Sequence, residues 1–194
     1  MFNKEKFIKD SLRESSEIKL QVLDKCYEDI LKVAGLFIEC IKGGHKLLFC
    51  GNGGSAADCQ HLATEFMVRL SHDVNRPAIG ALALTTDSSN LTAGGNDIGF
   101  ENIFSRSVEG LGNSGDILIG ISTSGNSQNI INAVRKAKEM KITTIGFLGG
   151  SGGELKKECD YSICIPSENI QRIQESHITV GHILCEITER ELYT

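Results

Sequence analysis

The segment that most constrains the fold is residues 47–65, in which four apolar residues run directly into glycines: LLFCGNGGSAADCQHLATE. The glycines are too many for a strand to continue through them. Ser55 is a suitable helix N-cap, and the alanine, leucine and glutamate that follow favour a helix to about residue 70. The segment therefore predicts a strand, a tight turn and a helix. The N–H groups at the start of such a helix can bind a phosphate or another oxygen-rich group.

Two reactive side chains lie further along this predicted helix. His61 and Glu65 are four residues apart, so they share one helix face. Most pairs with this spacing are surface ion pairs. Here the pair follows an anion-binding turn on the same element, which makes it a candidate for chemistry.

Apolar runs and helix-forming segments alternate along the rest of the chain. Strands are expected at residues 46–50, 78–84, 116–121, 142–148 and 161–165. Helices are expected at residues 55–70, 99–110 and 128–140, and the polar segment 85–97 reads as a loop with a short helix. Runs this apolar must be covered on both faces, so they predict a doubly wound, five-stranded parallel sheet flanked by helices. The length suits one domain spanning residues 1–194.

Long helices are predicted at both ends of the chain. The N-terminal helical arm covers residues 1–42, with a helix from residue 3 that breaks near Ser15 and Ser16. Its apolar stripe is wider than packing on a sheet requires. The last helix, at residues 167–192, has heptad-like apolar spacing at Ile170, Ile173, His177, Val180, Leu184 and Ile187. Both helices are expected to pack between subunits of an oligomer.

Composition excludes several classes of protein. The net charge is −5 and no long basic block is present, which argues against nucleic-acid binding. No apolar run reaches the roughly 18 residues that span a membrane, and the first residues lack the apolar core of a signal peptide. The seven cysteines form no C-x-x-C motif. We expect a reduced, cytoplasmic protein that does not bind membranes.

A second hydroxyl-rich turn follows the third predicted strand, at residues 122–127, with the sequence STSGNS. In an open parallel sheet, ligands bind beyond the carboxyl ends of strands. Two such turns predict a phosphate site, although plain turn chemistry with Ser127 as a helix cap is the alternative. Dinucleotide binding is the rival interpretation, because Gly51-x-Gly53-x-x-Ala56 fits that fingerprint. However, Asp73 precedes the second strand, whereas the fingerprint's acid should end it.

The last helix offers partners for His61 and Glu65. At about 100° per residue, His182 lies about 20° from Glu175 and about 80° from Gln174, so either residue can join it in one site. His177 falls in the apolar seam and is expected to be packed. Two histidines, one glutamate and a further oxygen ligand would suit zinc.

Several motifs together, in order along nearly the whole chain, resemble the sugar-isomerase (SIS) family and, within it, the phosphoheptose isomerases. They are the 51–58 segment GNGGSAAD with His61 and Glu65, then GGND at 94–97, ISTSGNS at 121–127, and IQESHI at 173–178 with His182. The combination is far more specific than any one motif.

The resemblance implies a flavodoxin-like SIS fold and a homotetramer with active sites between subunits. It implies an aldose–ketose isomerase that converts sedoheptulose 7-phosphate to D-glycero-D-manno-heptose 7-phosphate for bacterial envelope glycans. It assigns one zinc ion per subunit to His61, Glu65, Gln174 and His182, thereby choosing Gln174 over Glu175. It assigns substrate contacts to Asn52, Gly53, Gly54, Glu65, Asn96, Asp97, Ser122, Thr123, Ser124, Ser127 and Gln174. The turn at Ser55 adds that residue to the phosphate site.

The reaction moves one proton from C1 to C2 and another between the two oxygens, through an enediolate. We expect Glu65 to be the base and His182 the acid. A carboxylate bound to zinc is a weaker base, so the two roles of Glu65 conflict unless it moves or the metal is structural.

Other functions within the resemblance are a non-catalytic tetramer that binds a partner such as the replication initiator, a sugar-phosphate-sensing regulator, and an isomerase of another phosphosugar. The presence of both Glu65 and His182 favours an enzyme. The choice of a heptose rests on the resemblance alone.

Overall fold

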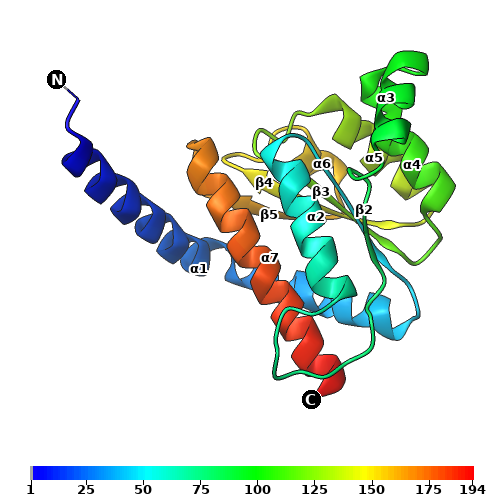
Figure 1. The fold of residues 1–194 in the computed structure, drawn as a ribbon, viewed down its shortest axis with the longest axis horizontal. Coiled ribbons are helices and arrows are strands. Elements are labelled where there is room, and N and C mark those ends of the chain that lie inside the picture. The colour runs from blue at the N-terminus through cyan, green and yellow to red at the C-terminus, as the bar shows by residue number, and fades with distance from the viewer. Residues whose placement is uncertain (1) are drawn as a thin grey trace.

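The computed structural model, which describes residues 2–194, contains a sheet of five parallel strands in the order β2-β1-β3-β4-β5 (Figure 1). The strands are β1 (Leu47–Gly51), β2 (Ala81–Ala83), β3 (Ile117–Ser122), β4 (Thr143–Gly149) and β5 (Tyr161–Ile165). The α-helices are α1 (Lys4–Lys42), α2 (Gly54–Met67), α3 (Ser88–Asp97), α4 (Ile103–Leu111), α5 (Gln128–Glu139), α6 (Leu155–Glu158) and α7 (Ile170–Tyr193). A 3-10 turn, η1 (Phe100–Asn102), precedes α4. The predicted doubly wound parallel sheet is confirmed.

The sheet is buried on both faces because alternate residues of its strands enter two different cores. Leu47 and Phe49 of β1 face a core shared with α1, α2 and α7. Leu48 and Cys50 face a core shared with α4, α5 and α6. This two-sided burial explains why the strands read as continuous apolar runs rather than as alternating ones.

The strand order places the two polar turns next to each other. From β1 the chain crosses to β2 on one side and then returns to β3 on the other, so the connections diverge between β1 and β3. Gly51 pairs in register with Ile121, which brings the turn after β1 beside the turn after β3. This divergence point is where open α/β sheets bind ligands.

The start of α2 differs from the prediction. Gly53, with a φ of 55°, occupies the N-cap position without a side-chain hydrogen bond, and the helix begins at Gly54. Ser55 is therefore not the cap but a buried residue of the first turn. A left-handed conformation at the cap favours glycine over serine, because serine carries a Cβ.

Residues 78–97 also differ in detail. The second strand is shortened to Ala81–Ala83 at the edge of the sheet, and the expected loop contains the ten-residue helix α3. The Asp87 side chain caps α3 by accepting a hydrogen bond from the Asn90 N–H. None of the residues of α3 is buried. The glycines and polar residues that indicated a loop are thus held in a helix that has no core of its own.

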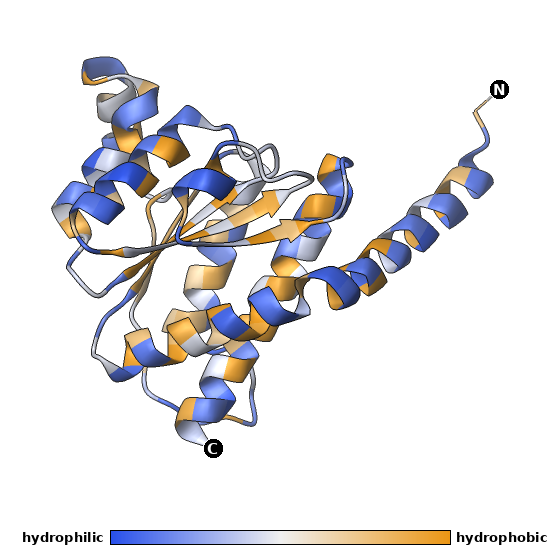
Figure 2. Ribbon diagram, turned by 180° about the vertical axis from the view of Figure 1, so that it is seen from behind, coloured by the Kyte–Doolittle hydropathy of each residue, from blue (hydrophilic) through white to orange (hydrophobic). Residues whose placement is uncertain are grey.

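The N-terminal helix α1 is continuous, so the predicted break at Ser15 and Ser16 is wrong. Serine costs a helix only a few tenths of a kcal/mol, roughly, whereas a break requires proline or a similar disruption. Ser15 also donates a hydrogen bond to Glu175 of α7 over 2.8 Å. The first half of α1 projects away from the sheet and carries apolar side chains into solvent (Figures 1 and 2). The wide stripe noted in the sequence lies further along, at residues 18–41, and there Leu23 and Leu31 also remain exposed.

Helix α7 buries most of its predicted seam. Ile173, Val180 and Leu184 are buried, whereas Ile170 in the first turn is 60% exposed. His177 is buried, as predicted, against the ring of Phe147. Its Nε2 donates a hydrogen bond to the Leu148 carbonyl over 3.0 Å. The ring is therefore neutral and forms part of the core between α7 and β4.

His177 makes the stability of the fold depend on pH. Burial lowers the pKa of His177 from its usual 6.5 to about 4. The unfolded chain thus binds a proton between these pH values and the folded chain does not, so this stabilisation is complete above pH 6.5 and is lost as the pH falls to 4. We expect a loss on the order of 3 kcal/mol across that window.

The change His177→Gln tests this expectation, because an amide can donate the same hydrogen bond without titrating. Urea unfolding of both proteins between pH 4 and 7 should show a flatter acid limb for the variant. Parallel curves for the two proteins would mean that other groups cause the acid sensitivity.

The cysteines form no disulfide among the described residues, and the described helices do not suit a bilayer. The seven cysteines, all within residues 2–194, are free, and burial raises the pKa of most of their thiols. Among the described helices, none combines the length and hydrophobicity that crossing a bilayer requires.

Candidate active site

Helices α2 and α7 lie side by side on one face of the sheet and bring three candidate residues together (Figure 1). The Nε2 atoms of His61 and His182 are 2.8 Å apart. The Nε2 of His61 is 3.4 Å from Oε1 of Glu65. The potential ligand atoms of all three residues lie within 4.8 Å of one another. One chain therefore assembles the predicted base and acid from segments more than a hundred residues apart.

This closeness depends on a glycine where the helices meet, Gly181. A Cβ on Gly181 would lie 2.5 Å from Cδ2 of Leu62, which is closer than atoms can pack. A Cβ on Gly54 would lie 2.5 Å from Nε2 of Gln174. Gly181 precedes His182 and Leu62 follows His61, so this packing sets the distance between the two imidazoles.

The three side chains suit a metal ion. Two imidazole nitrogens and a carboxylate oxygen are a common zinc ligand set that leaves a position open for a substrate or a further ligand. The side chain of His61 is 46% exposed and that of Glu65 is 18% exposed, so a small molecule can reach both.

The structure places Gln174 and Glu175 on different sides of α7. The Gln174 amide lies against Gly54 at the start of α2, whereas Glu175 accepts a hydrogen bond from Ser15 and pairs with Arg172 over 3.1 Å. Glu175 is thus occupied by the α1 side of the molecule. Gln174 lies on the α2 side, beside the turn after β1.

The two hydroxyl-rich turns are joined by a pair of amides. Asn52, after β1, and Asn129, in the first turn of α5, exchange two hydrogen bonds of 2.9 Å. The turn after β3 is held internally, since Ser122 Oγ is 3.2 Å from Ser127 Oγ and also accepts from the Gly125 N–H. Ser122 is buried, Thr123 is half-buried and Ser124 is exposed. These turns form the carboxyl edge of the sheet beside the start of α2, with Gly53 and Gly54 exposed at its surface.

Asn96 and Asp97 stand apart from this cluster. They end α3, are exposed, and hydrogen bond to each other over 2.6 Å. Helix α3 packs on η1 and α4, and within residues 2–194 no hydrogen bond joins it to α2 or α7. The single chain therefore leaves these two residues away from the histidine pair.

Two polar residues of the site region were not predicted from the sequence. Asn129 is buried and holds Asn52 in place. Asp58, one turn before His61, has a buried Oδ2 without a hydrogen-bond partner, and burial raises its pKa while nearby His61 lowers it. Asp58 belongs to the 51–58 motif that carries the resemblance, which was the available signal, whereas Asn129 lies two residues beyond the 121–127 motif. Helical spacing alone gave no reason to select them.

Comparison with known proteins supports one family throughout. The SIS domain model matches residues 12–149. A phosphoheptose isomerase from Clostridium acetobutylicum is 52% identical over 189 residues, which cover 96% of this chain and 95% of that protein. The solved phosphoheptose isomerases of Neisseria gonorrhoeae and Francisella tularensis align with TM-scores of 0.91 and 0.93, at 38% and 35% identity. Each of these two alignments covers 97% of this chain and 100% of the other.

Proposed function

As a member of the phosphoheptose isomerase family of SIS-domain proteins, this chain is an aldose–ketose isomerase, and we propose that its substrate is sedoheptulose 7-phosphate. The product is D-glycero-D-manno-heptose 7-phosphate, a precursor of envelope glycans such as lipopolysaccharide or capsule. The observation that carries this proposal is the cluster of His61, Glu65 and His182 beside the two hydroxyl-rich turns.

In the proposed mechanism, Glu65 removes the proton from C1 and returns it to C2. His182 moves the second proton between the two oxygens, so that the enediolate never carries a full unscreened charge. Their potential ligand atoms lie within 4.8 Å of each other, which lets both act on neighbouring carbons of one sugar. The phosphate, at the far end of the substrate, fixes the C1–C2 bond against Glu65.

The phosphate is proposed to bind at the turn 122–127 and near Ser55. Asn52, Gly53 and Gly54 are proposed to contact the sugar, together with Thr123 and Gln174. This arrangement uses hydroxyls and the N–H groups at the starts of α2 and α5, and needs no lysine or arginine.

Replacing Ser124 with alanine tests the phosphate site. Its Oγ accepts a hydrogen bond from the Asn126 N–H over 3.2 Å, and its side chain is exposed to an incoming ligand. We expect KM to rise about 3–10-fold with little change in kcat, because one hydrogen bond to a charged group is lost. Initial rates over a range of substrate concentrations measure this, and an unchanged KM would place the phosphate elsewhere.

One zinc ion per subunit is proposed at His61, Glu65 and His182, with Gln174 as the fourth ligand. Zn²⁺ bound there would supply a Lewis acid that polarises the substrate carbonyl, and in that case Glu65 would have to leave the ion to act as the base. Metal analysis of the purified protein, with and without His61→Ala, tests both the stoichiometry and the site.

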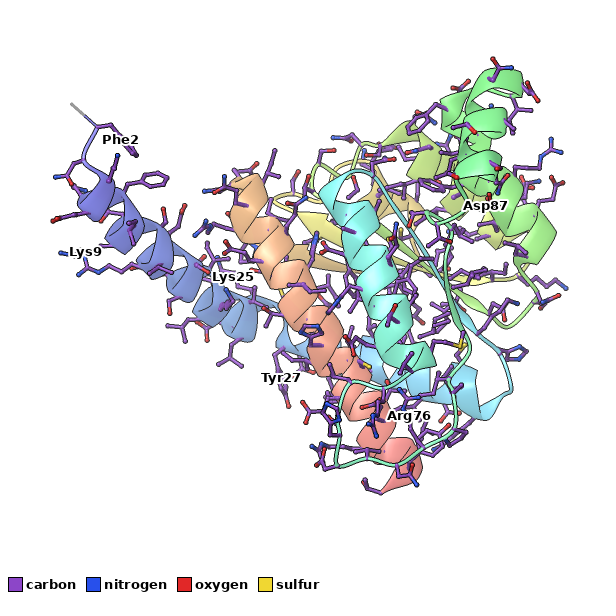
Figure 3. All side chains as sticks on the ribbon, in the orientation of Figure 1. Phe2, Lys9, Lys25, Tyr27, Arg76 and Asp87 are labelled. Carbon is purple, nitrogen blue, oxygen red and sulfur yellow. The ribbon has the colours of Figure 1, made fainter. Side chains whose placement is uncertain are left out.

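A cytoplasmic homotetramer with active sites between subunits is proposed as the working form. An apolar groove of about 290 Å³ runs between α1 and α7, lined by Val22, Leu23, Tyr27, Leu31, Val180 and Ile183 among others. Figure 3 shows Tyr27 projecting from α1 beside α7, and Phe2 at the far end of the arm. Helix α3, which buries no residue and carries Asn96 and Asp97, also fits a site that is completed by assembly.

The experiment that tests the function is incubation of the purified protein with sedoheptulose 7-phosphate, followed by detection of a new aldose phosphate. Turnover of a pentose phosphate instead would identify another phosphosugar isomerase. Binding of sugar phosphates without turnover of any would favour a sensor or a non-catalytic partner protein.

A further inference from the structure

A fully buried ion pair lies between the end of α2 and the last turns of α7, outside the cluster described above. The side chains of Arg76 and Glu189 are both 0% exposed, and Nε of Arg76 donates to Oε1 of Glu189 over 2.7 Å. In Figure 3, Arg76 lies beside the last turns of α7, below the end of α2. Burial this complete is rare for an arginine and a glutamate unless they are paired.

Each partner also holds backbone atoms at the end of α2. The guanidinium of Arg76 donates to the carbonyl of Glu65 over 2.8 Å and to that of Pro77 over 2.9 Å. The carboxylate of Glu189 accepts from the N–H groups of Leu70 and Ser71, over 3.0 and 3.3 Å. The Glu65 carbonyl belongs to the last turn of α2, where no further helical N–H group is available to it. Arg76 therefore fixes the end of α2.

The same contacts connect the pair to both proposed proton-transfer residues. Arg76 binds the main chain of Glu65 itself. Glu189 follows His182 by seven residues, or about two turns, so both lie on the face of α7 that meets α2. Cys185, one turn from each of them, is also buried. A shift of this ion pair would therefore change the position of Glu65 relative to His182.

Stability alone does not explain such a pair. Removing two charges from water costs several kcal/mol per ion, roughly, and apolar replacements of similar size are often neutral or stabilising. The pair instead imposes a fixed geometry, since the planar guanidinium of Arg76 can donate to its three oxygen partners in only one arrangement. We propose that Arg76 and Glu189 are positioning residues that set the register of α2 against α7 and thereby the geometry of Glu65 and His182.

The proposal rests on the proposed function and is tested by the double variant Arg76→Met, Glu189→Gln. It removes both charges but keeps side-chain volume and an acceptor for the Leu70 N–H. We expect kcat to fall about 10–100-fold with KM within about 3-fold, because a displacement near 1 Å is costly to catalysis. The melting temperature should stay within about 4 °C of the wild type, and the pH profile of kcat/KM should shift.

A control pair lies at the amino-terminal ends of β1 and β3. Lys46 pairs with buried Asp116 over 2.5 Å, and Asp116 also accepts from the N–H groups of Lys46 and Asn113. The double variant Lys46→Met, Asp116→Asn removes both charges from a pair whose side-chain hydrogen bonds, within residues 2–194, reach neither α2 nor α7. It should lower the melting temperature without altering kcat or the pH profile.

The variant Arg76→Lys covers the case in which the double variant does not fold. Lysine keeps the charge but cannot bind Glu189 and the Glu65 carbonyl in one planar fork. We expect a folded protein whose kcat is about 3–10-fold lower. A wild-type kcat in Arg76→Lys or in a folded double variant would overturn the positioning role. Full activity in Glu65→Gln would instead overturn the proposed mechanism, so the two failures are distinguishable.

Discussion

Replacing Glu65 with glutamine is expected to lower kcat about 10²–10⁴-fold, the range that a positioned general base contributes. Glutamine keeps the size of the side chain and its hydrogen-bonding oxygen, but it cannot accept the C1 proton. Because the substrate is held mainly by its phosphate at the turns after β1 and β3, KM should change little. Steady-state kinetics on sedoheptulose 7-phosphate, together with exchange of the C1 proton with solvent deuterium, measures both effects.

A matched control is Glu186→Gln, which makes the same change at an exposed carboxylate on α7. Within residues 2–194, Glu186 pairs with Arg190 alone, at 2.9 Å, and it lies one turn beyond His182. It should keep normal kinetics. A near-normal kcat for Glu65→Gln would show that another group is the base, and wash-in of deuterium would then identify whether proton abstraction still occurs.

The second large effect is expected for Gly181→Val. A Cβ at this position would lie 2.5 and 2.7 Å from the methyl carbons of Leu62, which is itself buried. Relief requires α7 to move away from α2, and overpacking of this kind costs about 1–3 kcal/mol. The same movement would separate His182 from His61, now 2.8 Å apart. Activity should fall about 10²-fold or more, because such displacements disrupt the reacting geometry.

Gly110→Val is the control for this change. Gly110 lies in helix α4, and a Cβ there would meet nothing within 4 Å. It should leave both stability and activity near wild type. Adding Leu62→Ala to Gly181→Val should restore part of the activity, since it removes the atoms that clash. If the effects of the two substitutions are additive in this double-mutant cycle, the clash with Leu62 is not the cause of the lost activity.

Much of the fold could be predicted from the sequence because its signals are local. Strand β5 occupies residues 161–165, as predicted, and β3 and β4 differ by one residue at each end. Their continuous apolar runs reflect burial on both faces, which is a property of short segments. The strand order follows from that alternation together with the resemblance.

The errors occurred where a tertiary or backbone condition decided the outcome. Ser15 did not break α1, because serine costs a helix little, and its hydroxyl instead bonds to Glu175 on a helix far along the chain. The helix expected within the loop at residues 85–97 occupies most of that segment, as α3, with Asp87 as its cap. Gly53 rather than Ser55 occupies the N-cap position of α2, and the sequence did not reveal its positive φ.

The same distinction between local spacing and tertiary packing applies to the candidate site. The sequence by itself determined that His61 and Glu65 share a helix face, and that hydroxyl-rich turns end two strands, because both follow from spacing along one element. Spacing left the partner of His182 open, and the resemblance chose Gln174 over Glu175. Only the tertiary structure showed how closely His182 approaches His61, that Gln174 lies against Gly54, and that Arg76 reaches the carbonyl of Glu65. These depend on how closely two helices approach each other. That distance is set by the small size of Gly181 and, as proposed above, by a buried ion pair, neither of which periodicity encodes.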